Sequence, residues 1–213
     1  MARLFLAPTG DSPETSADAG CLDPQESLTR LCELRDRREG ISHDNPVLLT
    51  GVRNVKEAID KLERTGFARD VLFIDTPGSM VPIIQSAVNV ADCILLPIRP
   101  SVLDLVAQED AALIASEYGK QDAIAVVLNA IDGRAGAEDS EKRIISRFGK
   151  KPVRVNQRVA YSRALVAGKS GAEIDKECSR EIRELWAAIE EVLRRERHVE
   201  VRRKPTGHTE QRQ

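Results

Sequence analysis

An aspartate directly follows a short apolar run near the middle of the chain. The segment "DVLFIDTPGS" spans residues 70–79, and its apolar residues end at Asp75. A carboxylate at the tip of a buried strand can hold Mg²⁺ beside nucleotide phosphates, as in the Walker B arrangement. Gly78, in the turn that follows, would let the backbone approach a γ-phosphate closely. A simple strand-end turn explains this stretch equally well, so other parts of the sequence must decide.

Two more notable residues stand at the ends of apolar runs. "CILLPI" at residues 93–98 contains Pro97, and the run over residues 124–128 is followed by Asn129. Continuous apolar runs of this length predict strands that are buried on both faces. Ligands of parallel α/β sheets bind beyond the carboxyl ends of the strands. Asp75, Pro97 and Asn129 all occupy such ends, which favours a nucleotide site over a simple turn.

Helical segments alternate with these runs and must position them. Helical periodicity and capping residues predict helices near residues 54–66, 82–92, 104–119, 138–149 and 179–194. Shorter strands are expected at residues 47–49 and within 151–158. Because strands and helices alternate, we expect an α/β fold in which helices flank both faces of a mostly parallel sheet.

Composition limits the classes of protein to consider. The chain has 213 residues, of which 41% are hydrophobic and 31% charged, with a net charge of −2. This suits one globular domain, which we place at residues 21–195, after an irregular lead (1–20) and before a basic, flexible tail (196–213). Aromatic residues make up only 3% of the chain, which argues against a stacking surface for bases or sugars.

The cysteines and the apolar segments indicate the cellular compartment. The four cysteines are scattered, so a disulfide framework or a zinc site is not expected. The N-terminus lacks the apolar core of a secretion signal, and no run reaches the roughly 18 apolar residues of a membrane span. A soluble, cytoplasmic protein is therefore expected.

Several short motifs occur in a characteristic order. "DPQES" at residues 23–27, "IDTPG" at 74–78, "PIRPS" at 97–101 and "VVLNAID" at 126–132 resemble the ParA/MinD family of deviant Walker ATPases. The ParA branch, which acts in plasmid and chromosome partition, is the most similar, and the resemblance covers about Leu22 to Leu193. It implies a P-loop NTPase-like fold, ATP and Mg²⁺ as cofactors, and a cytosolic, nucleoid-associated dimer. It also implies non-specific DNA binding and stimulation by a ParB-type adaptor.

The resemblance implies a role for individual residues. Asp23 would help to position the attacking water, and Asp75 would be the Walker B carboxylate that holds Mg²⁺ through water. Asn129 would bind the adenine edge, because its amide offers both a donor and an acceptor; capping of the next turn is the alternative. The other nucleotide-facing residues that the resemblance implies are Thr76, Pro77, Gly78 and Pro97.

The phosphate-binding loop of that family has no counterpart in this sequence. The family pattern K-G-G-x-x-x-x-G-K-T follows a first strand, whereas no lysine occurs between Met1 and Cys21. Either Arg3–Ala7 substitutes for the missing central strand or the core is incomplete, and a truncated or frame-shifted gene start is the simplest explanation. "AGKS" at residues 167–170 is no replacement, because Arg163 stands where a P-loop needs glycine. It is better explained as a boundary between helix and loop.

The missing loop has consequences for activity. Without its lysine and backbone amides, Asp23 and Asp75 alone would repel the phosphates, so we expect weak ATP binding and negligible hydrolysis. An impaired partition ATPase is the first hypothesis. The alternatives are a non-catalytic module that modulates an intact ParA-type partner, in a homodimer or heterodimer, and a truncated remnant.

The C-terminal residues carry a cluster of positive charge. The cluster could contact DNA phosphates without regard to base sequence, in which case binding would weaken steeply with salt. A solvated terminus explains the same residues at least equally well. The cluster consists of Arg194, Arg195, Arg197, Arg202, Arg203 and Lys204.

Overall fold

A seven-stranded sheet forms the centre of the computed structural model, which describes residues 3–6, 17–22, 30, 33–35, 37, 47–49, 54–65, 71–77 and 81–203. In space the strands run β3-β2-β4-β1-β5-β6-β7. Their bounds are β1 (Arg3–Leu6), β2 (Ala17–Cys21), β3 (Val47–Leu49), β4 (Val71–Asp75), β5 (Cys93–Ile98), β6 (Ile124–Ile131) and β7 (Val153–Asn156). The described helices are α2 (Val55–Thr65), α3 (Val81–Val90), α4 (Val102–Glu117), α5 (Arg134–Phe148), α6 (Val159–Val166), α7 (Gly171–Ile174) and α8 (Lys176–Arg203).

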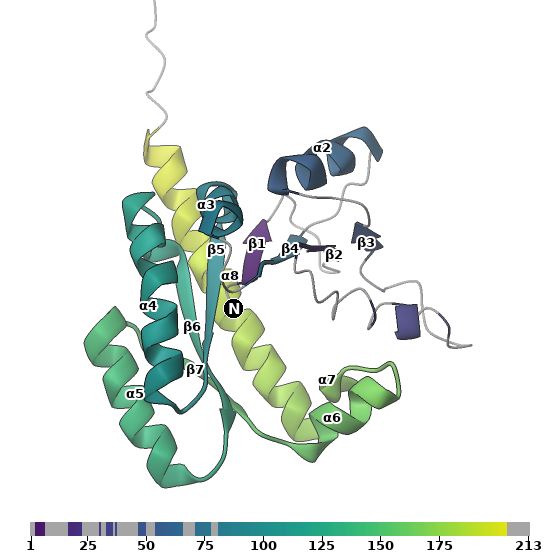
Figure 1. Ribbon diagram of the computed structural model, residues 1–213, viewed down its shortest axis with the longest axis vertical. Helices are drawn as coiled ribbons and strands as arrows, with labels where there is room; N and C mark the ends of the chain where they lie inside the picture. Colours follow the sequence, from purple (N-terminus) through teal and green to yellow (C-terminus); the bar gives the residue numbers. More distant parts are fainter. Residues whose placement is uncertain are drawn as a thin grey trace, which may run out of the picture.

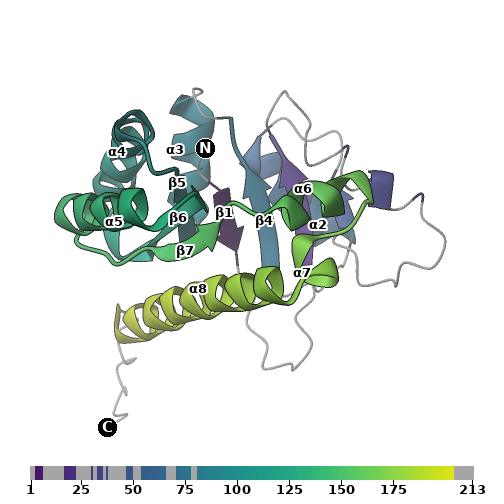
Figure 2. The ribbon, with the colours of Figure 1, turned by 90° about the horizontal axis from the view of Figure 1, so that it is seen from below.

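Helices cover both faces of the sheet. The helices α3, α4 and α5 lie on one face and the long helix α8 on the other (Figures 1 and 2). Successive strand residues alternate between these layers: Leu72 and Ile74 belong to the core under α2–α5, whereas Val71 packs in the core with α8. Because both faces are buried, the strands are continuously apolar, and the predicted α/β class is confirmed.

The central strand β1 runs opposite to its neighbours. It pairs antiparallel with β4 (Arg3 opposite Asp75) and with β5 (Arg3 opposite Leu95), while the other pairings in the sheet are parallel. The expected substitute strand is therefore present in the central position, but in reverse. The length of the connection explains this direction. Only residues 7–16 separate β1 from β2, and a parallel crossover needs about a dozen residues or more.

Several predicted boundaries differ from the structure. Residues 1–20, expected to be an irregular lead, include strand β1 and most of strand β2. The last helix was expected near residues 179–194, but α8 continues to Arg203, so the first part of the predicted tail is helical. Asn54 caps the start of α2, because its Oδ1 accepts a hydrogen bond from the Glu57 backbone N–H at 2.9 Å. In the described residues, no helix combines the length and apolar character that a membrane crossing requires.

Candidate functional site

The parallel strands end at one common edge of the sheet, which we name the carboxyl edge. It is formed by the last residues of β2, β4, β5, β6 and β7. Asp75 ends β4 there and is 4% exposed, and Thr76 beside it is fully buried. Burial of a carboxylate is costly unless polar groups or a cation compensate for it. The carboxyl edge is therefore where chemistry is expected.

Three of the predicted site residues share one face of this edge. Side chains alternate along a strand, so Asp75 points to the side of Val71, which is the side that α8 covers. By the same alternation, the side chain of Pro97 points to the same side as Leu95, and that of Asn129 to the same side as Val127. Leu95 and Val127 both belong to the core under α8. The structure thus brings these three residues to one edge and one face.

The three residues form an extended line. Arg3 of β1 pairs with Asp75 on one side and with Leu95 on the other. Leu95 in turn pairs with Ala125 of β6, which lies four residues before Asn129. Three strand spacings of about 4.8 Å and four residues of about 3.3 Å place Asp75 and Asn129 roughly 20 Å apart. That separation matches the two ends of an extended nucleoside triphosphate better than a compact catalytic cluster.

The segment that leads into "DPQ" begins beside Asp75. The backbone N–H of Leu22 donates to the carbonyl of Asp75 at 2.8 Å, and Cys21 pairs with Asp75 in the sheet. Asp23 and Gly78 lie outside the described residues, so their predicted roles stay predictions. Pro77 is described and is buried.

The end of β6 is irregular next to Asn129. Ala130 adopts a positive φ of 53°, and the pairing with β7 shifts register between Leu128 and Ile131. An L-residue in this conformation costs about 1–2 kcal/mol. Bulges of this kind are common beside functional sites, where they re-aim a side chain. The N–H of Gln157 donates to the carbonyl of Ile131 at 2.9 Å, which ties the turn after β7 to this bulge.

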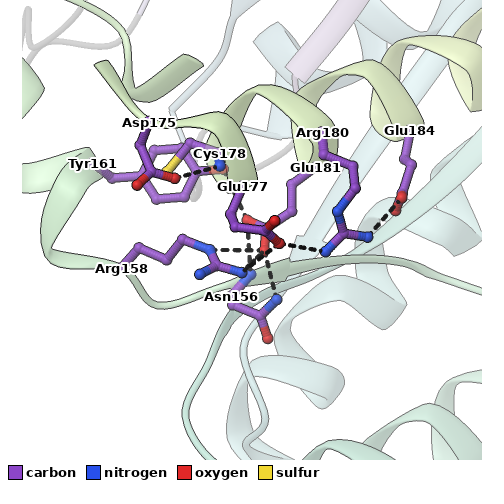
Figure 3. Close-up of polar contacts among 9 residues, drawn as sticks. All are labelled: Asn156, Arg158, Tyr161, Asp175, Glu177, Cys178, Arg180, Glu181 and Glu184. Carbon is purple, nitrogen blue, oxygen red and sulfur yellow. Dashed lines mark hydrogen bonds and ion pairs between the residues drawn. The ribbon is translucent and has the colours of Figure 1, made fainter. Parts of the chain in front are cut away.

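A buried glutamate of α8 organises the turn after β7 (Figure 3). Glu181 is 1% exposed, and its carboxylate accepts hydrogen bonds from two atoms of the Arg158 guanidinium at 2.8 and 2.9 Å. It also accepts from the Asn156 side chain at 2.6 Å and from the Tyr161 hydroxyl at 3.0 Å. We name this group the Glu181 hub. Because its members come from β7, α6 and α8, the hub fixes three elements beside the carboxyl edge.

Electrostatics in the hub favour the ionised carboxylate. Burial alone would raise the pKa of Glu181, but the hydrogen bonds from Arg158, Asn156 and Tyr161 outweigh it and hold the pKa below its usual value. Burial, with the hydrogen bond to Glu181, raises the pKa of Tyr161 well above its usual range. Tyr161 therefore stays a hydrogen-bond donor and Glu181 an acceptor throughout the neutral range.

The Glu181 hub was not predicted from the sequence, although the sequence carries a signal for it. Residues 178, 181, 185, 189 and 192 recur at spacings of three and four, which is the buried stripe of an amphipathic helix. Glu181 is the one charged residue in that stripe. A charge at a core position predicts a buried partner, and Arg158 at the start of α6 supplies it.

The carboxyl edge carries Asn129, which was predicted to bind a base, and the central strand runs away from this edge. Asn129 offers amide groups that suit an adenine edge. In the family that the sequence resembles, the phosphate-binding loop follows the central strand. Here the central strand β1 is reversed, so the residues after β1 start from the edge of the sheet opposite to the carboxyl edge. Within the described ranges, no group of three or more His, Cys, Asp or Glu residues is arranged to hold a metal ion.

"AGKS" at residues 167–170 is a link between two helices, as expected. Gly168 has a positive φ of 63° after α6, and Ser170 caps α7 together with Glu173. Because the Ser170 N–H already donates to Glu173 at 2.6 Å, this segment does not form a phosphate-binding loop.

The predicted DNA-contacting residues lie away from the carboxyl edge. Arg194 and Arg195 are exposed on α8, 13 and 14 residues beyond Glu181, which is about 20 Å along the helix. Arg195 pairs with Glu191, and Nε of Arg194 donates to the Glu190 carbonyl at 3.2 Å. Helix α8 includes positions 197, 202 and 203 in its backbone, but the side chains of Arg197, Arg202 and Arg203 lie outside the described part, as does Lys204.

Comparisons with known proteins bear on the family and the fold. A family model described as "ATPase MipZ" matches residues 33–162, which is more than half of the chain and includes Asp75, Pro97 and Asn129. Among solved structures, a ParA family ATPase from Chlorobium tepidum TLS is similar, with a TM-score of 0.56 and 14% sequence identity. The similarity covers 86% of this chain and 88% of that one, and at this identity it concerns the fold. No match was found among curated proteins.

Proposed function

The chain belongs to the MipZ family of ATPases, and from this membership we propose that it is a ParA/MipZ-type homologue acting in plasmid or chromosome partition, with impaired ATP hydrolysis. The observation that carries the proposal is the reversed central strand. Asp75 and Asn129, the proposed Walker B and base-binding residues, lie toward the carboxyl edge, whereas the reversed β1 leads the chain to the opposite edge of the sheet.

The missing phosphate contacts set the expected loss of ATP affinity. Each charge-assisted hydrogen bond contributes about 1.5–3 kcal/mol. Loss of only two such contacts weakens binding by about 3–6 kcal/mol, a factor of roughly 10² to 10⁴ in Kd. The carboxylate of Asp75 adds repulsion toward the triphosphate when no cation is held. Weak ATP binding and negligible turnover by residues 1–213 follow.

The proposed partners follow from family membership and from the charge of α8. We propose a ParB-type adaptor, non-specific DNA, and a homodimer or a heterodimer with an intact homologue, in the cytoplasm at the nucleoid. The DNA contact would use the arginines near the end of α8, Arg194 and Arg195 among them, which are exposed. Reversal of β1 also supports the second hypothesis, a non-catalytic module that modulates an intact partner.

A direct titration tests the nucleotide part of the proposal. Calorimetry of the full chain with Mg-ATP is expected to give a Kd of about 1 mM or weaker, with no phosphate release above the background rate. The residual binding should weaken further in Asn129→Ala and stay unchanged in the control Asp132→Asn, which alters an exposed residue of the same "NAID" motif. A micromolar Kd or steady turnover by the isolated chain would refute the impaired-ATPase proposal.

DNA binding is tested separately. Duplex retention by the full chain should fall steeply as salt rises, and it should be lost when residues 194–213 are removed. If the truncated chain retains DNA as well as the full chain does at low salt, the α8 terminus is not the DNA contact.

A further inference from the structure

We propose that a cavity between α4 and α5 binds a phosphate-sized oxyanion, either free or at the end of a small phosphate monoester. The cavity has a volume of about 180 Å³ and lies where β5 ends and α4 begins. The residues that line it include two arginines, Arg99 and Arg143, and two serines, Ser101 and Ser140. All four are hydrogen-bond donors suited to phosphate oxygens.

The two arginines differ from other arginines near them. Arg147, one helical turn after Arg143 on α5, pairs with Glu109 at 2.6 Å, and Arg154 pairs with Glu141. Within the part of the chain that the structure describes, neither Arg99 nor Arg143 has an ion-pair partner. Both side chains are exposed, and an oxyanion bound beside them would gain charge-assisted hydrogen bonds.

The start of α4 adds positive potential to the same cavity. Ser101 is the N-cap residue, in an extended conformation, but its side chain makes no capping hydrogen bond to the first turn. A helix of 16 residues carries roughly half a positive charge at this end. Asp139 also lines the cavity and opposes anion binding with one negative charge. The two arginines and the helix end together outweigh it.

The size of the cavity and its place in the fold limit the ligand. The volume of about 180 Å³ is below the roughly 300–1,000 Å³ of typical small-molecule pockets, which favours a phosphate group with a small carrier over a whole nucleotide. Ile98 and Ile144 of its wall belong to the core under α3–α5, on the face of the sheet opposite to Asp75 and Asn129. The proposed site is therefore separate from the candidate nucleotide site.

Titrations followed by amide NMR test this proposal on the full chain. Inorganic phosphate and phenyl phosphate are added at constant ionic strength to the wild type, Arg99→Gln, Arg143→Gln and the matched control Arg147→Gln. Saturable shifts are expected around residues 99–102 and 139–144. The phosphate Kd should increase about tenfold or more in the first two variants and less than about twofold in the control, because each of the first two loses a charge-assisted contact.

The outcomes separate the ligand sources and the alternatives. Tighter binding of phenyl phosphate supports a monoester, and equal binding supports a free oxyanion. The proposal is overturned if phosphate causes no saturable shift up to about 50 mM, a concentration at which binding would contribute under about 2 kcal/mol. It is also overturned if Arg99→Gln and Arg143→Gln bind like the control, or if the shifts centre on Asp75 and Asn129.

Discussion

The Glu181 hub should make a large contribution to the free energy of unfolding, and Glu181→Gln tests it. Glutamine keeps the shape of the side chain but cannot pair as an anion with Arg158, and its amide group faces the donors of Asn156 and Tyr161. Breaking a buried ion pair costs about 3–5 kcal/mol. The Arg158 side chain is 29% exposed, so water compensates in part and we expect a loss of about 3 kcal/mol.

Urea unfolding at pH 7 measures this loss. With a slope of about 1–3 kcal/mol per molar urea, the midpoint should fall by about 1 M or more. The matched control is Glu184→Gln on the same helix, where an exposed pair with Arg180 is removed. This control should leave the midpoint unchanged within error, because exposed ion pairs contribute little.

The pH dependence gives an independent check on the hub. Because the pKa of Glu181 is lowered in the folded state, its contribution is complete above the unfolded value of about 4.3 and is lost as the pH falls through the folded value. The difference between the wild type and Glu181→Gln should therefore shrink toward pH 3.5. A loss below about 1 kcal/mol at pH 7, or a difference that does not depend on pH, would refute the argument that a buried, ionised hub stabilises the fold.

Three more substitutions probe the neighbourhood of the site. Gly171→Ala should destabilise by about 1–3 kcal/mol in thermal unfolding, because the new Cβ would lie 2.4 and 2.7 Å from ring atoms of Tyr161; unchanged stability would mean that the ring is free to move. Tyr161→Phe should cost about 1–2 kcal/mol by removing one donor to Glu181, and a neutral result would place the hydroxyl outside the hub. Ala130→Gly should stabilise by about 0.5–1 kcal/mol, since glycine tolerates the positive φ; destabilisation would argue against the bulge.

The sequence predicts the parts of this fold that depend on local patterns. The apolar runs at residues 71–74, 93–98 and 124–128 became β4, β5 and β6 because continuous burial has a clear signature. The direction of β1 could not be predicted from Arg3–Leu6, because a four-residue strand can form backbone hydrogen bonds with its neighbours in either direction. The direction depends on which strands β1 pairs with and on the short connection to β2, and the pairing is a tertiary property.

The candidate site was predictable only in part. Asp75, Pro97 and Asn129 were found because strand ends mark the ligand edge of a parallel sheet. Their separation of roughly 20 Å follows from register, which no local pattern reveals. Glu181 and Arg158 lie 23 residues apart in sequence, so their contact depends on how α6 folds back onto α8.

A comparison of adenosine with Mg-ATP tests the central claim most directly. If the carboxyl edge keeps the base-binding half of a nucleotide site and lacks the phosphate-binding half, both ligands should bind this chain with similar, weak affinity, within about fivefold, or about 1 kcal/mol. Calorimetric titration of the wild type with each ligand at equal ionic strength gives the ratio. Binding of Mg-ATP more than about a hundredfold tighter than adenosine, or about 2.7 kcal/mol, would contradict the account, because it would require a working phosphate site.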